Sequence, residues 1–164
     1  GPDSGGVGTE EPLMFRNAGA TFAGIVIAAV VYTAIRELGL MFYAPPEGLN
    51  FSDPESVDRY HAQLPLGAYL VVFGKPVVAA FIGTLVACFA GTMNSYNFGA
   101  IIGGIVLTYT VSLFIAEPHP IWIVLTTLVA IVISTYLAAR IAPQSDRGPL
   151  ELFEDESDSG QNPG

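Results

Sequence analysis

Four long apolar stretches constrain the fold of this chain more than any other feature of its sequence. A helix that crosses about 30 Å of hydrocarbon at a rise of 1.5 Å per residue needs about 20 predominantly apolar residues. The four stretches meet this length, and they cover residues 17–43, 65–91, 98–116 and 120–142. We therefore expect an all-α membrane protein, a four-transmembrane-helix up-and-down bundle with both termini on one side.

The composition agrees with helices in a bilayer. Of the 164 residues, 51% are hydrophobic and only 13% are charged. The formal net charge of −9 lies mostly in two tails, 1–14 and 143–164, which we expect to be disordered. Six Lys and Arg residues scattered over the whole chain form no basic patch. Nucleic acid is therefore not an expected partner, whereas the lipid bilayer is.

The connections between the stretches predict how the spans are joined. The segments 91–97 and 117–120 are short and polar, so each should form a tight hairpin. The connection 44–64 is longer, and its Ser-Asp-Pro-Glu run at 52–55 is typical of a helix start. We expect a short surface helix over 53–63, because Val57, Tyr60 and Leu64 recur on one face.

The positions of the arginines predict the orientation. Arg16, Arg140 and Arg147 lie on the side of the termini, against Arg59 and Arg36 on the side of the long connection. Because cytoplasmic loops carry an excess of Lys and Arg, we expect both termini to be cytoplasmic and the short helix to be outside.

Lys75 is the residue most indicative of a site. Ten residues beyond Pro65, it should lie about 15 Å into the hydrocarbon, where a charge costs about 2.5–3.5 kcal/mol and requires a partner. Glu37 lies at nearly the same depth, so we expect an intramembrane polar pair of Lys75 and Glu37. The pair could serve a polar pathway or proton relay. A structural ion pair, or a neutral lysine bonded to a carbonyl that Pro76 frees, is the favoured interpretation.

Arg36 precedes Glu37 directly, and adjacent helical residues point about 100° apart. We therefore expect Arg36 to anchor lipid headgroups rather than to pair with Glu37.

Small residues at four-residue spacing predict close helix packing. The pattern leaves open whether they pack within the bundle, which is favoured, or against another subunit. These residues are Gly83, Ala87 and Gly91 in the second span and Gly99 and Gly103 in the third.

No catalytic or cofactor motif is evident. His61, Glu117 and His119 fall on the outer side, but their spacing fits no metal-binding pattern. We expect no metal, no cofactor and no enzymatic activity.

Five segments between Leu38 and Ala142 resemble a group of small, uncharacterised four-span bacterial inner-membrane proteins. The segments are 38–39 with 43–46, 48–49, 52–55, 64–68 and 118–122. The resemblance implies a bacterial inner membrane and the four-span layout, and it brings no activity. The chain departs from the pattern at Lys75-Pro76 and in its acidic tails.

Two functions of different classes are compatible with this sequence. The first is an accessory or structural subunit of a larger membrane complex, with other membrane subunits or further copies of itself as partners. The second is a small oligomeric transporter or channel that uses Lys75 and Glu37. The sequence favours the subunit, because the third and fourth spans offer no polar lining comparable to that of small four-span multidrug transporters.

Overall fold

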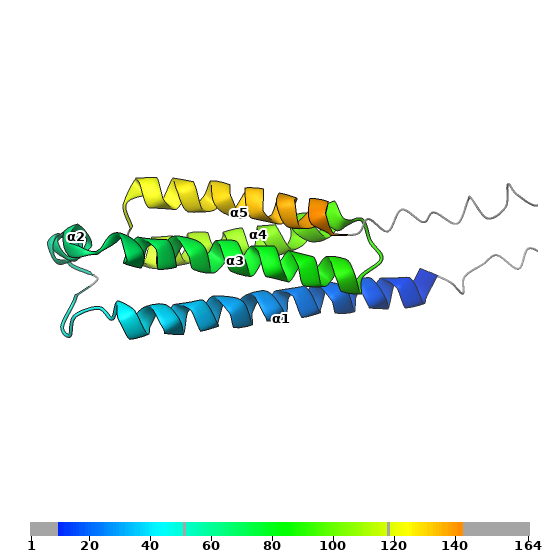
Figure 1. The fold of residues 1–164 in the computed structure, drawn as a ribbon, viewed down its shortest axis with the longest axis horizontal. Helices are drawn as coiled ribbons and strands as arrows, with labels where there is room; N and C mark the ends of the chain where they lie inside the picture. Colours follow the sequence, from blue (N-terminus) through cyan, green and yellow to red (C-terminus); the bar gives the residue numbers. More distant parts are fainter. Residues whose placement is uncertain (1–9, 51, 118, 143–164) are drawn as a thin grey trace, which may run out of the picture.

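The computed structural model describes residues 10–50, 52–117 and 119–142, and these residues form five helices and no strand. Four of the helices are long and apolar enough to cross a membrane, and they lie side by side with the first described residues of α1 and the last of α5 at the same end (Figure 1). The protein is therefore an integral membrane protein with the predicted all-α bundle. The helices are α1 (Glu10–Phe42), α2 (Pro54–Gln63), α3 (Leu66–Ala90), α4 (Ser95–Ala116) and α5 (Ile121–Ile141).

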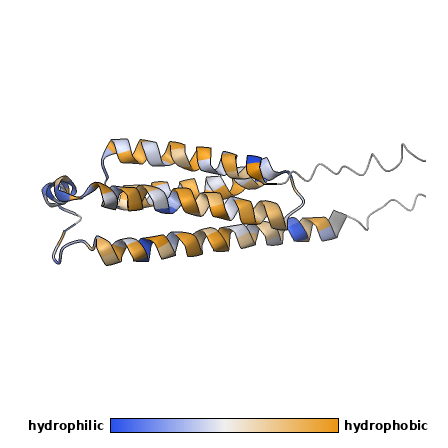
Figure 2. Ribbon diagram, viewed as in Figure 1, coloured by the Kyte–Doolittle hydropathy of each residue, from blue (hydrophilic) through white to orange (hydrophobic). Residues whose placement is uncertain are grey.

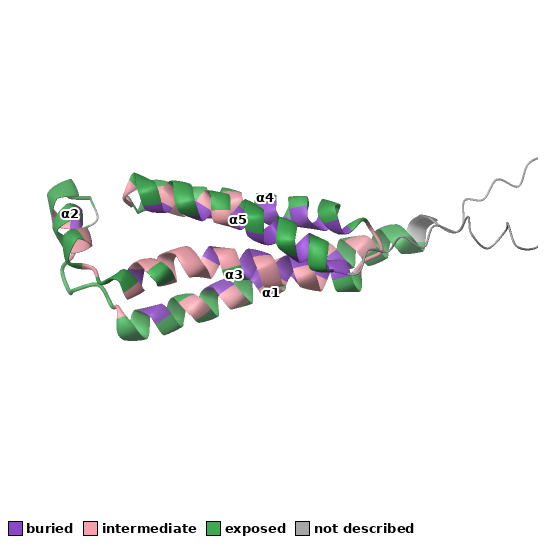
Figure 3. Ribbon diagram, turned by 45° about the horizontal axis from the view of Figure 1, so that its top comes forward, coloured by how far each residue is buried: buried purple, intermediate pink, exposed green. Residues whose placement is uncertain are grey.

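Helix α3 is the centre of the bundle. It packs against α1, α4 and α5, whereas α1 makes only a small contact with α4 (Figure 1). Glycines allow the α1–α3 crossing to be close, because a Cβ on Gly83 would lie 2.7 Å from the carbonyl oxygen of Gly24 and 2.8 Å from Ala28 Cβ. The buried sides of the helices face one another along this core (Figure 3).

Hydrogen bonds fix the α3–α4 connection against α1 at the end where the termini lie. The side-chain oxygen of Asn17 accepts from the backbone N–H groups of Thr92 and Met93, at 2.8 and 3.1 Å, and from the Thr92 hydroxyl at 3.0 Å. Arg16 donates to the carbonyl of Ala90 at 3.2 Å. The Asn17 side chain thus supplies the acceptor that the backbone N–H groups of this tight turn would otherwise lack.

Two helices begin earlier than expected. α1 begins at Glu10 rather than near residue 17, and α4 begins at Ser95 rather than at 98. Asn94 explains the second difference, because its side chain caps α4 by accepting from the Tyr96 N–H at 2.9 Å. For α2 the cap is Asp53, with Pro54 in the first turn. The disordered tail predicted over 1–14 is wrong for residues 10–14, which belong to α1. Residues 1–9 and the predicted tail over 143–164 lie outside the described residues.

The outward surface of the bundle suits a bilayer. Large apolar side chains are exposed on all four long helices, and the ribbons are mostly hydrophobic along their length (Figure 2). Aromatic pairs mark the two ends: Tyr69 with Trp122 near α2, at 5.5 Å between ring centroids, and Tyr96 with Tyr136 at the other end, at 5.8 Å. Such aromatic belts are typical of membrane–water interfaces.

Candidate functional site

The end of the bundle that carries α2, here called the α2 end, is held together by side chains. The Tyr69 hydroxyl donates to the carbonyl of His61 at 2.9 Å, and the His61 ring lies 5.5 Å from the ring of His119 in the α4–α5 connection. Burial lowers the pKa of His61; His119 lowers it further, and Asp58 opposes the shift. These contacts hold α2 at the end of the four-helix bundle.

Beneath α2 lies a cavity of two adjoining compartments, which we call the polar cavity. The compartments have volumes of about 310 and 300 Å³. The first extends under α2 to His61 and Tyr69, and the second extends between α1, α3 and α4 to Tyr32 and Tyr109. Both are lined by Arg36, Val72, Lys75, Glu117 and His119.

Lys75 lies where the two compartments meet. Its ammonium is 5.3 Å from the centroid of the Tyr32 ring, a cation–π contact from α3 to α1. Within the described ranges, its ammonium forms no ion pair or hydrogen bond. The carbonyl bond that Pro76 was expected to make possible is also not formed. Lys75 therefore faces the polar cavity without a bonded acceptor among the described residues.

The structure does not bring Glu37 to Lys75. Glu37 lies five residues after Tyr32 and therefore points about 140° away from it around α1. Its carboxylate instead accepts from Arg36 at 2.7 Å, on side chains that are 54% and 59% exposed. The expectation that Arg36 and Glu37 stay apart is wrong, because two long side chains can bridge adjacent positions. The carboxylate that lines the cavity with Lys75 is that of Glu117.

A second, unpartnered polar group lines the same cavity. Thr110 is 3% exposed, and its hydroxyl has no hydrogen-bond partner. The hydroxyls of Thr84 and Thr127 in the bundle core are also buried without a partner, and the Thr110 oxygen itself is closed off from solvent. Thr110 therefore borders the cavity without presenting its hydroxyl to it.

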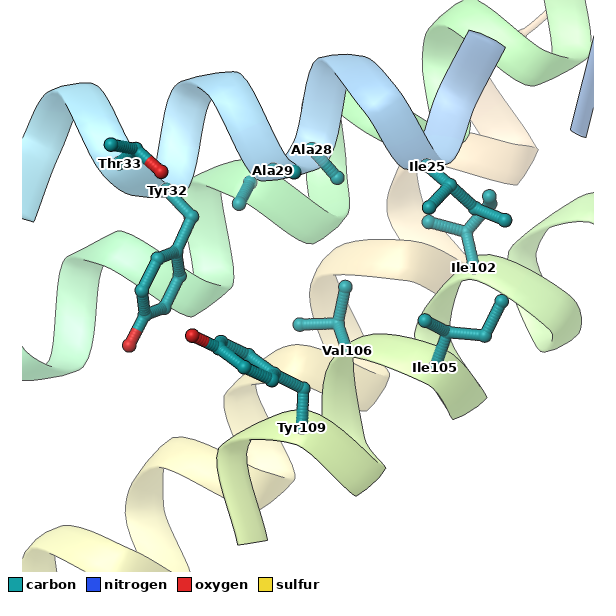
Figure 4. A pocket seen from close by; sticks show the side chains of 10 residues that line it. Ile25, Ala28, Ala29, Tyr32, Thr33, Ile102, Ile105, Val106 and Tyr109 are labelled. Carbon is teal, nitrogen blue, oxygen red and sulfur yellow. The ribbon is translucent and has the colours of Figure 1, made fainter. Parts of the chain in front are cut away.

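An apolar crevice of about 250 Å³ continues from the polar cavity between α1 and α4. Tyr32, Thr33 and Tyr109 belong to both, and the two tyrosine rings meet edge to face with centroids 5.4 Å apart. In Figure 4 their hydroxyl ends approach each other at one end of the crevice. The rest of its lining is apolar and consists of Ile25, Ala28, Ala29, Ala79, Ile102, Ile105 and Val106.

The small residues singled out from the sequence lie within the bundle. A Cβ on Gly99 would lie 3.2 Å from the Thr135 carbonyl oxygen, and one on Gly103 would lie 3.1 Å from the side chain of the same residue. Gly83 and Ala87 pack against α1 at Gly24, and Gly91 ends α3 beside the Phe98 ring.

A different set of small residues faces outward on α4. Ala100, Gly104, Thr108 and Ser112 recur at four-residue spacing and are exposed, and a Cβ on Gly104 would meet nothing within 4 Å. We call this set the exposed small-residue face. Ile101, Ile105 and Tyr109 line a shallow groove with its last three members.

Sequence reasoning located Lys75 but missed the residues around it. Tyr32, Tyr109 and Thr110 look like ordinary span residues in the sequence. The one available signal was that Tyr32 lies one helical turn before Arg36, on the face toward α3.

Among the described residues, no group of three or more His, Cys, Asp or Glu could hold a metal ion. Comparison of the chain with protein-family models, with curated proteins and with solved structures gave no match.

Proposed function

We propose that this protein is a non-enzymatic accessory subunit of a larger complex in the bacterial inner membrane, with cytoplasmic termini. The observation that carries the proposal is the exposed small-residue face of α4. In lipid, helices associate mainly by close packing and interhelical hydrogen bonds, and small residues allow the backbones to approach. A helix of another subunit is the partner that such a face fits.

The face has no role inside the bundle that would explain it. Gly104 meets no atom of the described chain that would exclude a side chain, although glycine costs a helix about 1 kcal/mol relative to alanine. The hydroxyls of Thr108 and Ser112 donate to carbonyls four residues earlier, at 2.8 and 2.9 Å. The side chains of this face are therefore small, and their hydroxyls are hydrogen-bonded within α4. Both properties suit a surface that packs against another helix in lipid.

A transporter or channel is the second candidate, and the polar cavity at Lys75 favours it. A conduction path would have to continue toward the other end of the bundle. There the described core is closed by apolar and small side chains, among them the fully buried Phe98, Ile102 and Ile131. The subunit is therefore the better-supported function.

Replacement of Gly104 tests the proposal. Gly104→Leu would fill the face, and Gly19→Leu on α1 is the matched control, since a Cβ on Gly19 would also meet nothing within 4 Å. After cross-linking in native membranes and mild extraction, we expect one reproducible set of partner chains, lost in Gly104→Leu and kept in Gly19→Leu. Equal partner recovery in all three proteins, or cross-links only between copies of this chain, contradicts the proposal.

Lys75→Met tests the second candidate. The subunit function predicts that reconstituted vesicles show no ion or solute flux with either the original protein or Lys75→Met. A flux that the original protein supports and Lys75→Met abolishes would establish the transporter instead.

A further inference from the structure

We propose that the polar cavity and the apolar crevice together form one binding site for a long-chain carboxylate. The carboxylate would lie at Lys75, and the hydrocarbon chain would lie between α1 and α4. The site adjoins the exposed small-residue face, with which it shares Ile105 and Tyr109, but its proposed ligand goes beyond the accessory role and does not depend on it.

The head of the ligand is specified by the donors of the polar cavity beside the crevice. The Lys75 ammonium has no hydrogen-bond or ion-pair partner among the described residues. The hydroxyls of Tyr32 and Tyr109 lie where the cavity meets the crevice (Figure 4). A carboxylate offers two oxygens with about four acceptor sites, which matches this set of donors. Glu117 lines the same cavity but lies beyond ion-pair distance of the Lys75 ammonium, so a bound carboxylate would be the counter-charge in direct contact with it.

The tail of the ligand is specified by the crevice. From Tyr32 to Ile25 the crevice follows α1 for seven residues, about 10 Å along the helix axis. Ala29 and Thr33 on α1 and Ile105 on α4 line it and are exposed, so it opens sideways toward the bilayer. A hydrocarbon chain can therefore enter from the membrane without opening the bundle.

Size distinguishes a single-chain carboxylate from a phospholipid. Lys75 lies nine residues into α3 from Leu66, about 13 Å along the axis, and six residues below Tyr69, which marks the interface with Trp122. Any head group bound at Lys75 therefore lies about 9 Å below that level. A carboxylate with one chain needs less room at this depth than a phosphate with its glycerol and two chains, and the crevice has a volume of about 250 Å³.

Lys75 is the only lysine of the sequence, so its labelled signal has to be distinguished only from that of the N-terminal amine, which Lys75→Met identifies. Reductive methylation with ¹³C-formaldehyde labels its amine and keeps the charge. In a non-ionic detergent, hexadecanoate should shift this ¹³C signal saturably. Hexadecanol, acetate and phosphatidylglycerol should each bind at least about tenfold more weakly, a difference of about 1.4 kcal/mol. Binding as tight by acetate or phosphatidylglycerol would overturn the proposal in favour of a small-anion or phospholipid site.

Variants test both halves of the site through the ¹³C-carboxyl signal of labelled hexadecanoate. Lys75→Met should weaken binding at least about tenfold, and Lys75→Arg should restore most of it. Ala29→Trp should block the crevice, whereas Ala34→Trp, about 140° away on α1 and also exposed, should bind normally. Unchanged binding in Lys75→Met or in Ala29→Trp overturns the proposal. These results concern only the cavity, so the partner test at Gly104 stands or fails separately.

Discussion

Replacement of Gly83 by alanine perturbs the closest helix crossing in the bundle. The new Cβ would lie 2.7 Å from the Gly24 carbonyl oxygen and 2.8 Å from Ala28 Cβ, whereas ordinary contacts begin at 3.4 Å. The α1–α3 crossing must therefore widen, and overpacking of this kind costs about 1–3 kcal/mol. The intrinsic helix preference for alanine over glycine returns up to about 1 kcal/mol.

Gly74→Ala is the matched control because it lies on the same helix and its Cβ would meet nothing within 4 Å. It gains the same helix preference without the clash, so the two variants should differ in unfolding free energy by about 1–3 kcal/mol. Reversible unfolding in mixed micelles, with dodecyl sulfate as denaturant and circular dichroism as signal, measures this difference. Equal stability of Gly83→Ala and Gly74→Ala would refute the close crossing.

Two further predictions concern the ends of the bundle. Asn17→Ala should destabilise the protein in the same assay by about 1–3 kcal/mol, because two N–H groups and a hydroxyl lose their acceptor. Asn97→Ala, at an exposed position, should change little, and an equal loss in both would contradict this role. At the α2 end, burial lowers the pKa of His61 below its ordinary 6.5, so a state with α2 detached from the bundle takes up a proton at a higher pH than the packed state does. The packing of α2 on the bundle should therefore be complete above pH 6.5 and weaken below it. Amide exchange of α2, corrected for its intrinsic pH dependence, should then be faster below pH 6.5 than above it, and this difference should disappear in His61→Gln. Identical protection of α2 above and below pH 6.5 in the original protein would contradict this.

The architecture could be predicted from the sequence because bilayer thickness fixes the length of a span. Uninterrupted apolar runs therefore identified four helices, and short polar segments identified the hairpins. Boundaries were less certain, since the start of α4 depends on the Asn94 cap, a local interaction that hydropathy does not contain. The short helix was recognisable because Pro54 follows a capping residue directly.

The site was predictable only in part. Depth along a helix identified Lys75, but a depth match with Glu37 ignored the direction in which each side chain points around its helix. The structure assigns Glu37 to Arg36 and brings Glu117 to the cavity from a different connection. Such neighbours depend on how three helices pack around α3, and no spacing within one segment encodes them.

Lys75 faces a cavity that opens at the α2 end of a membrane-spanning bundle. A membrane-impermeant amine-reactive reagent tests it directly, applied to each face of oriented vesicles, with the Lys75 peptide quantified by mass spectrometry to separate it from the N-terminal amine. Lys75 should be labelled from the face that carries α2 and not from the face that carries the termini. Labelling from the terminal face, or protection from both faces in vesicles depleted of free fatty acids, would contradict it.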